Sequence, residues 1–337
     1  GLVLLRLPLK AERTLTHMKK AAQLNNWIAN NIPFLILAAL IAGLLFPTQL
    51  GVFSPYVGYM MIFQTFANSL GGGFRDLAQV MAHPKPVLLT MLTLHVLMPV
   101  IALGAGVLIF PQNPLYTLSL VLVESSPAAV SSLIWMTIGG GSTGICLSTV
   151  LLDSLLSPLI LPLTLRLLCG TMVALDTLGL IKSLMVMVVI PAAAAMFLCR
   201  VWGRERCSHL KTQLALPSKL VLLLIVSANV TRCADSLRHL NISLALLVCC
   251  SLVMRVLGLT IGFGISRLFR LPYDTGLAVS VNSGMRNNSA AATLAAQYFP
   301  SDVVFSPSVS PVLSQLSVSL AVRLLQRVYP SGETTPK

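Results

Sequence analysis

The chain has 337 residues, of which 55% are hydrophobic and only 10% charged, and its mean hydropathy is +0.85. Because soluble domains carry about 25% charged residues, water would not solvate a surface this poor in charge. The apolar runs are roughly 20 residues long, which is the helix length that spans a hydrocarbon core of about 30 Å. They lack the alternating pattern of membrane β-strands. Composition therefore excludes a soluble domain and predicts a bundle of membrane-spanning helices.

The formal net charge of +13 does not indicate nucleic-acid binding, because no compact basic domain exists to carry it. Most of this charge lies between apolar runs, where it sets topology. The seven cysteines form no C-x-x-C pair, and most lie in apolar segments, so neither a zinc site nor a disulfide framework is predicted. We expect no cofactor.

At the N-terminus, residues 2–9 are apolar but short and contain Arg6. This does not fit a cleavable signal peptide. Met18, followed by two lysines, is an alternative start, which would make residues 1–17 an upstream extension.

In chain order, the apolar runs predict about ten transmembrane helices separated by short turns rich in glycine and proline. The predicted spans are roughly 30–47, 52–72, 87–110, 115–138, 143–166, 172–199, 214–231, 241–266, 273–298 and 303–325.

Orientation follows from lysine and arginine, which concentrate on the cytoplasmic side. With the N-terminus inside, the predicted outer segments keep only Arg166, Arg232 and Arg238. We therefore expect both termini in the cytoplasm and a multi-pass protein of the plasma or inner membrane.

Ten spans divide into two groups of five, and an odd-numbered group starts its second copy from the opposite side of the membrane. This predicts two inverted five-helix repeats, a fold in which broken, crossing helices build the central site. The predicted segments are a cytoplasmic N-terminal segment 1–29, a first repeat 30–170, a second repeat 171–326 and a cytoplasmic tail 327–337.

The fourth and ninth spans are both interrupted by polar residues, at 124–132 and 282–289. Proline removes a backbone donor and glycine lets a helix unwind. Because the freed backbone groups are costly in lipid, such breaks line a cavity or pack in protein. We expect the two breaks to form one polar, substrate-binding cavity near the midplane. Its predicted residues are Ser131, Ser132, Asn282, Ser283, Arg286, Asn287 and Asn288.

Three segments resemble the bile acid:sodium symporter family: Pro127 to Pro158, Val281 to Ser289, and Leu94 to Pro99. The resemblance implies a core domain and a panel domain from a ten-helix inverted repeat. It also implies sodium-driven uptake of bile acids, pantoate, keto acids or similar organic anions, bound where the two broken helices cross.

The chain departs from this family's pattern where the family holds sodium. The ninth-helix glutamate and glutamine fall on Asn282 and Arg286, and a third-helix glutamine falls on His95. The resemblance places the remaining family ligands at Ser132, Leu133, Cys146 and Val150. Two unit cations about 4 Å apart repel by about 4 kcal/mol at an effective dielectric of 20. We therefore expect no sodium requirement at the family's second site.

Arg286 has two interpretations. A charge within a span usually faces a cavity or a partner, so Arg286 either binds a substrate carboxylate or forms a structural pair with Glu124 or Asp153. The long side chains of Arg255 and Lys182 are expected to carry their charged groups to a membrane interface.

The candidate ion-coupling residues are His95, Glu124, Asp153, Asn282 and Arg286. Glu124 and Asp153 each have two interpretations, as a proton carrier or as a fixed counter-ion. His95 titrates near physiological pH or only donates a hydrogen bond.

The sequence therefore predicts a secondary transporter of a small organic anion, coupled to protons or to exchange. The coupling ion is a proton or sodium, and no nucleic-acid or obligate protein partner is expected. A sodium-coupled symporter with a remodelled site, a channel and a receptor that does not transport remain as alternatives. An enzyme is not expected, because the five histidines form no H-E-x-x-H or comparable motif.

Overall fold

The computed structural model describes residues 23–328, apart from residues 30, 74, 75, 77, 79, 81 and 235–241. Most of the predicted N-terminal segment, most of the predicted tail, Arg75 and Arg238 lie outside the described residues. The part of the chain that is described is helical, with only two isolated β-bridges. This agrees with the predicted all-helical class.

Within the described ranges, six helical segments are long and apolar enough to cross a membrane, or seven if the bent pair Gln23–Ala29 and Ile32–Leu45 is counted as one span. The protein is therefore a multi-pass helical membrane protein. The six are Pro84–Ile109, Thr143–Cys169, Thr177–Trp202, Arg204–Cys233, Ile242–Leu268 and Ser301–Arg327.

The other four predicted spans contain shorter or interrupted helices. The first predicted span contains α2 (Ile32–Leu45), which is followed by the short helix α3 (Pro47–Gly51). The second contains the turn η1 (Ser54–Tyr56) and α4 (Val57–Ser69). Spans four and nine are helix pairs with a break inside each: α8 (Pro114–Ser125) and α9 (Ser132–Gly139), then α16 (Tyr273–Gly284) and α17 (Asn288–Tyr298). Both breaks lie at the predicted polar segments.

Two of the long segments contain a π-helical turn before a proline. The first consists of α6 (Pro84–Leu92), η2 (Thr93–Leu97) and α7 (Met98–Ile109). The second consists of α11 (Thr177–Leu184), η3 (Met185–Val189) and α12 (Ile190–Trp202). Proline lacks the N–H that would bond to the carbonyl four residues earlier, so the helix widens by one residue there. The remaining long segments are α10 (Thr143–Cys169), α13 (Arg204–Val230) with η4 (Thr231–Cys233), α15 (Ile242–Leu268) and α18 (Ser301–Val328).

Helix starts follow from capping residues. The side chains of Asn113, Ser142, Asp176 and Asn287 accept hydrogen bonds from the first free N–H groups of α8, α10, α11 and α17. Each cap satisfies a backbone donor that the helix itself leaves unpaired. Asn287 is the cap that restarts the helix after the second break.

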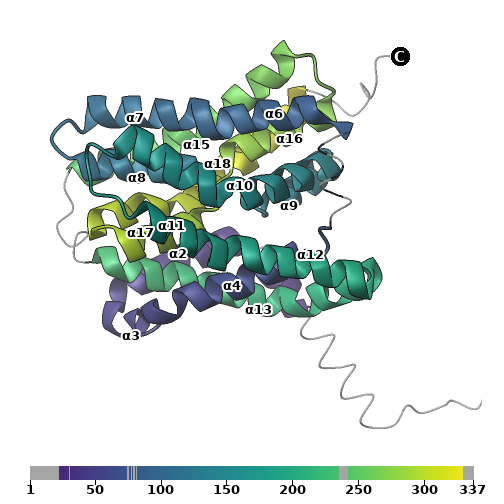
Figure 1. Ribbon diagram of the computed structural model, residues 1–337, viewed down its shortest axis with the longest axis horizontal. Helices are drawn as coiled ribbons and strands as arrows, with labels where there is room; N and C mark the ends of the chain where they lie inside the picture. Colours follow the sequence, from purple (N-terminus) through teal and green to yellow (C-terminus); the bar gives the residue numbers. More distant parts are fainter. Residues whose placement is uncertain are drawn as a thin grey trace, which may run out of the picture.

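The helices form two layers in Figure 1, one above the other. The lower layer holds α2, α4, α12 and α13, which pack against one another. The upper layer holds α6, α7, α8, α10, α15 and α16. α18 packs against α8 and α15 and also against α2 and α13. Each helix of the two broken pairs, α8, α9, α16 and α17, packs against α18.

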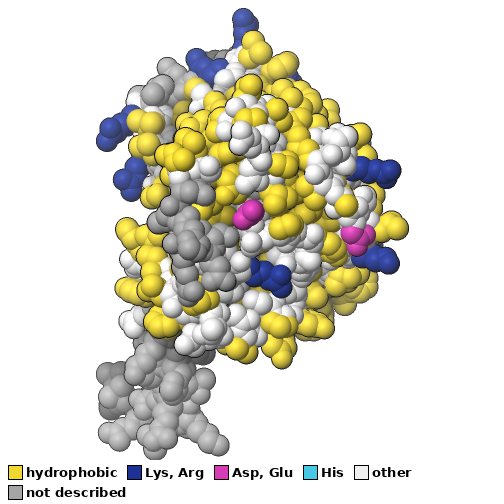
Figure 2. All heavy atoms as spheres, turned by 90° about the vertical axis from the view of Figure 1, so that its left-hand side faces the viewer, with side chains coloured by type: hydrophobic (Ala, Val, Ile, Leu, Met, Phe, Trp, Pro, Cys, Tyr) yellow, Lys and Arg dark blue, Asp and Glu magenta, His cyan; other side chains and the backbone are white. Residues whose placement is uncertain are grey.

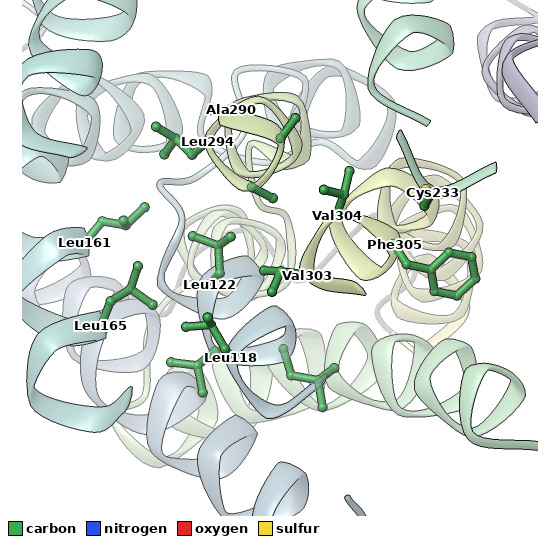
Figure 3. Packing of buried hydrophobic residues seen from close by; sticks show 14 of the residues in the cluster. Leu118, Leu122, Leu161, Leu165, Cys233, Ala290, Leu294, Val303, Val304 and Phe305 are labelled. Carbon is green, nitrogen blue, oxygen red and sulfur yellow. The ribbon is translucent and has the colours of Figure 1, made fainter. Parts of the chain in front are cut away.

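The main hydrophobic core lies where α8, α10, α17 and α18 converge, as Figure 3 shows. Leu122, Leu161, Leu294 and Val303 are fully buried there. The core includes α8 residues up to Leu122, two residues before Glu124. Figure 2 views one end of the helices, and hydrophobic side chains cover most of the visible surface, with charged groups scattered among them. Because it is formed by helix ends, this face lies toward one surface of the membrane and not toward the lipid chains.

Candidate functional site

The two broken helices meet at their breaks. The N–H of Asn287 donates to the carbonyl oxygen of Pro127 (2.7 Å), and the N–H of Ala129 donates to that of Met285 (3.2 Å). Ala128 and Arg286 form an antiparallel bridge between these bonds. The backbone groups freed by one break are thus satisfied by the other, which is how non-helical backbone is tolerated at membrane depth.

One polar cluster joins the first break to α10 and α16. The Oγ atom of Ser132 lies 3.1 Å from the Sγ atom of Cys146. The Cys146 thiol also lies 3.2 Å from Oδ1 of Asn282, whose Nδ2 donates to the Cys146 carbonyl at 3.3 Å. All three residues are buried. Two positions that the resemblance assigned to sodium, Leu133 and Val150, carry no oxygen on their side chains.

A second cluster is formed by charges. The carboxylate of Glu124, at the end of α8, pairs with Arg255 of α15 and lies 3.5 Å from Nη2 of Arg286 in the second break. The three side chains are at most 2% exposed. Nη1 of Arg255 also donates to the Gly284 carbonyl (3.4 Å), and Nη1 of Arg286 donates to that of Asn282 (3.5 Å). Two guanidinium groups therefore share one carboxylate and hold the end of α16.

The interface prediction for Arg255 is wrong, because its side chain is buried, whereas Lys182 is exposed. Arg255 lies thirteen residues from both ends of Ile242–Leu268, about 20 Å along the axis at 1.5 Å per residue, so its side chain reaches neither surface. Gly258 and Gly262, on the same helix, lie against Ser283 of α16, and a Cβ atom at Gly258 would lie 2.6 Å from the Ser283 carbonyl oxygen. This glycine spacing, which lets helices approach closely, was the signal that Arg255 faces protein.

The third cluster links the first break to the π-helical turn η2. Nε2 of His95 lies 2.6 Å from Oδ1 of Asp153, and the N–H of Ala128 donates to Oδ2 of Asp153 at 2.6 Å. Asp153 is fully buried and His95 has 8% of its side chain exposed. The Asp153 carboxylate thus ties the histidine to the backbone that bridges with Arg286.

Several buried polar atoms at or beside the breaks have no hydrogen-bond partner among the described residues. These atoms are Nδ1 of His95, Oγ of Ser125, Oγ of Ser283, Nε and Nη2 of Arg286, and Oδ1 of Asn288. A buried polar atom without a partner is costly and rare in native proteins. These atoms concentrate beside the two breaks.

The predicted site residues do not all face one point. Ser132, Asn282 and Arg286 lie together at the crossing. Ser283 packs against Gly262 of α15, and Asn288 donates from Nδ2 to Ser314 of α18 (3.1 Å). Ser131 and Asn287 are partly exposed. Sequence reasoning missed Arg255 and Ser314, the latter because a lone serine in an apolar helix gives no signal.

Broken helices that cross inside a bundle, around buried charges, are the arrangement of secondary membrane transporters. The family comparison agrees: the model of the "Sodium Bile acid symporter family" matches residues 58–240. The chain is also 32% identical over 296 residues to the protein YbaS of Bacillus subtilis (strain 168), covering 88% of this chain and 97% of YbaS. The chain therefore belongs to the sodium bile acid symporter family, a family of membrane transporters.

More distant relatives carry transporter names. A Bacillus subtilis (strain 168) protein named "Uncharacterized sodium-dependent transporter YocS" is 22% identical over 281 residues, covering 83% of this chain and 86% of the relative. An Arabidopsis thaliana protein named "Probable sodium/metabolite cotransporter BASS1, chloroplastic" is 23% identical over 261 residues, covering 76% of this chain and 63% of the relative. The resemblance read from the three short segments is thus confirmed over most of the chain.

Proposed function

We propose that this protein is a secondary active transporter that moves a small organic anion across the membrane by alternating access. The observation that carries the proposal is Arg286: a guanidinium group in the second break, almost fully buried, whose Nε has no hydrogen-bond partner among the described residues and whose Nη2 makes a long ion-pair contact of 3.5 Å with Glu124. In the proposed architecture, residues 30–170 and 171–326 form two inverted repeats whose broken helices cross beside Arg286. The two helix layers move relative to each other around this crossing during transport.

An anion fits this site better than a cation. Glu124 contacts both Arg255 and Arg286, but its pairing with Arg286 is long at 3.5 Å. The planar guanidinium group binds a carboxylate through two parallel hydrogen bonds. A substrate carboxylate at Nε and Nη2 of Arg286 would satisfy both donors while Glu124 stays with Arg255. Bile acids, pantoate and keto acids all present such a carboxylate.

The residues present do not fit a sodium ion at the second site. Arg286 and His95 stand at two of its positions and offer nitrogen, not the carboxylate and carbonyl oxygens that hard cations prefer. The guanidinium of Arg286 would also repel the ion by about 4 kcal/mol at 4 Å and an effective dielectric of 20. We propose that the guanidinium supplies the positive charge that holds the break.

A sodium-coupled symporter with a remodelled site is the second candidate. It is favoured by the name of the relative YocS, a sodium-dependent transporter, and by the side-chain oxygens of Ser132 and Asn282 on either side of Cys146. One sodium ion bound by these oxygens and by carbonyl groups would be enough for coupling.

Transport assays decide between the candidates. The purified protein is reconstituted in liposomes and tested for uptake of labelled cholate, pantoate and pyruvate, and for exchange against the same unlabelled anion. We expect saturable uptake and exchange of one of them, unchanged when choline or potassium replaces sodium at fixed pH. A strict, saturable sodium requirement would establish the second candidate instead. Flux of these anions without saturation or exchange would indicate a channel, and no flux at all would contradict both candidates.

A further inference from the structure

We propose that His95, held by Asp153, is the site that binds one co-transported proton for each substrate carboxylate. This inference rests on the proposed function and adds to it the coupling ion, the atom that carries it and the stoichiometry.

The histidine is placed by a local distortion of its helix. His95 is the central residue of η2, the π-helical turn at Thr93–Leu97. Pro99 has no N–H to donate to the His95 carbonyl, which is four residues earlier, and the turn widens there. Such π-helical turns occur frequently at functional sites. The widened turn brings the imidazole ring to Asp153 of α10.

The hydrogen bonds indicate where the proton binds. We assign the hydrogen of the 2.6 Å pairing to Nε2 of His95, which then donates it to Asp153, because an ionised carboxylate only accepts hydrogen bonds. In the neutral ring Nδ1 is then a bare acceptor, and it is buried without a hydrogen-bond partner among the described residues. A proton taken from water on one side of the membrane adds to the Nδ1 lone pair, forms an N–H bond there, and leaves to water on the other side.

The charges packed around His95 set the stoichiometry. η2 packs against α6, α7, α8, α10 and α15. The buried charges on these helices are Glu124 of α8, Asp153 of α10 and Arg255 of α15. Arg286, in the second break, is a further buried charge. The Cys146 thiol of α10 is neutral. Within their described residues, α7 has no titratable side chain and α6 has only Lys85, which is exposed at its first turn.

Two arginines and two ionised carboxylates sum to zero when His95 is neutral. A monocarboxylate on Arg286 brings the buried cluster to minus one, and a proton on His95 restores zero. Because net charge is expensive inside a membrane protein, the anion and the proton each make binding of the other more favourable, and this coupling is reciprocal. Asp153 also accepts the N–H of Ala128, the residue that bridges with Arg286, so both ligands act on the same break.

The first test uses proteoliposomes and the anion of the panel that exchanges. With one proton for each carboxylate, a pH difference of one unit, acid outside, should accumulate the anion about tenfold. Entry should acidify an internal pH dye, and a potassium–valinomycin potential of either sign should not change the accumulation. Liposomes without protein measure passive entry of the undissociated acid. Exchange without proton movement would overturn this inference and leave the proposed function intact, whereas no exchange of any panel anion would overturn both.

Variants locate the proton. His95→Gln keeps a hydrogen-bond donor for Asp153 but has no group that titrates near neutral pH, so the ratio of uptake with and without the pH gradient should fall to one. The matched control is His209→Gln, because His209 is an exposed histidine of α13; it should keep the wild-type ratio. A gradient-driven ratio that persists in His95→Gln would place the proton elsewhere.

A direct measurement covers the case in which His95→Gln does not fold. Nitrogen-15 NMR spectra of the wild-type protein, labelled at histidine and held in lipid nanodiscs, report the protonation of each ring. His95 should be neutral with the hydrogen on Nε2 in the absence of substrate, and it should become doubly protonated when the exchanged anion is added at constant pH. A His95 ring whose protonation does not respond to the anion between about pH 5 and pH 8 would overturn the inference.

Discussion

Glu124, the penultimate residue of α8, and Arg255, at the middle of α15, form an ion pair in which both side chains are almost fully buried. The pair joins the helix that leads into the first break to the helix that packs against the second. Removing one partner of a buried pair leaves an uncompensated charge, which costs about 3–5 kcal/mol. The pair therefore fixes the relation between the two breaks.

We predict that Arg255→Met and Glu124→Gln each lower the free energy of unfolding by about 3–5 kcal/mol. The double variant should be less destabilised than the sum of the two, because it leaves only Arg286 without the Glu124 carboxylate, whereas Glu124→Gln leaves both arginines without it. Chemical denaturation in detergent micelles, followed by tryptophan fluorescence, measures all three. Additive effects would show that the pairing contributes nothing to stability.

Replacing Arg286 should weaken substrate binding. Arg286→Gln removes a charged hydrogen-bond donor, a loss of about 1.5–3 kcal/mol, so the half-saturating anion concentration should rise by about 10- to 150-fold. Arg286→Lys keeps the charge but not the planar guanidinium group. Its half-saturating concentration should lie between those of the wild type and Arg286→Gln. The exposed Arg323 of α18 gives the control Arg323→Gln. Equal half-saturation for Arg286→Gln and this control would show that Arg286 is only a structural ion pair.

The close approach of α15 and α16 should depend on Gly258. Gly258→Ala places a Cβ atom 2.6 Å from the Ser283 carbonyl oxygen, so the helices must separate and carry Arg255 away from Gly284. Overpacking of this kind costs about 1–3 kcal/mol, and transport should fall with stability. Gly264→Ala, on the same helix with open space around it, should leave stability unchanged or raise it by up to about 1 kcal/mol. Similar melting temperatures in detergent for the two variants would contradict this packing.

The basic first turns of α13 should face the cytoplasm. Arg204 and Arg206 precede the exposed Ser208 there, and basic residues stay on the cytoplasmic side. A Ser208→Cys protein with its other cysteines removed should react with a membrane-impermeant maleimide only after the cells are opened. Labelling in intact cells would reverse the proposed orientation, with both termini outside.

Thiol reactivity should report opening of the crossing. Cys146 is fully buried beside Ser132 and Asn282, whereas Cys249 on α15 is exposed. In detergent, a protein that keeps only Cys249 should react rapidly with N-ethylmaleimide, and one that keeps only Cys146 should react slowly. A transported anion should change the Cys146 rate alone, because alternating access requires the breaks to open. Equal rates for the two thiols would contradict the packing at the crossing.

The sequence alone determined the membrane class and the position of the breaks. Twenty-residue apolar runs and a 10% share of charged residues have no stable arrangement in water. The residues at 124–132 and 282–289 combine proline or glycine with polar side chains, and a helix that contains them must open. These conclusions follow from local chemistry, because each depends only on residues that are neighbours along the chain.

Only the tertiary structure decided which residues meet. Nothing local shows that Asp153 accepts hydrogen bonds from both His95 and Ala128, or that the partner of Arg255 is Glu124. The same apolar run allows Arg255 to face lipid, a neighbouring helix or a cavity. The choice is made by Gly258 and Gly262, whose missing side chains admit α16. Partners far apart in sequence are selected by the packing of whole helices, and the energy of a buried charge depends on the partners that this packing supplies.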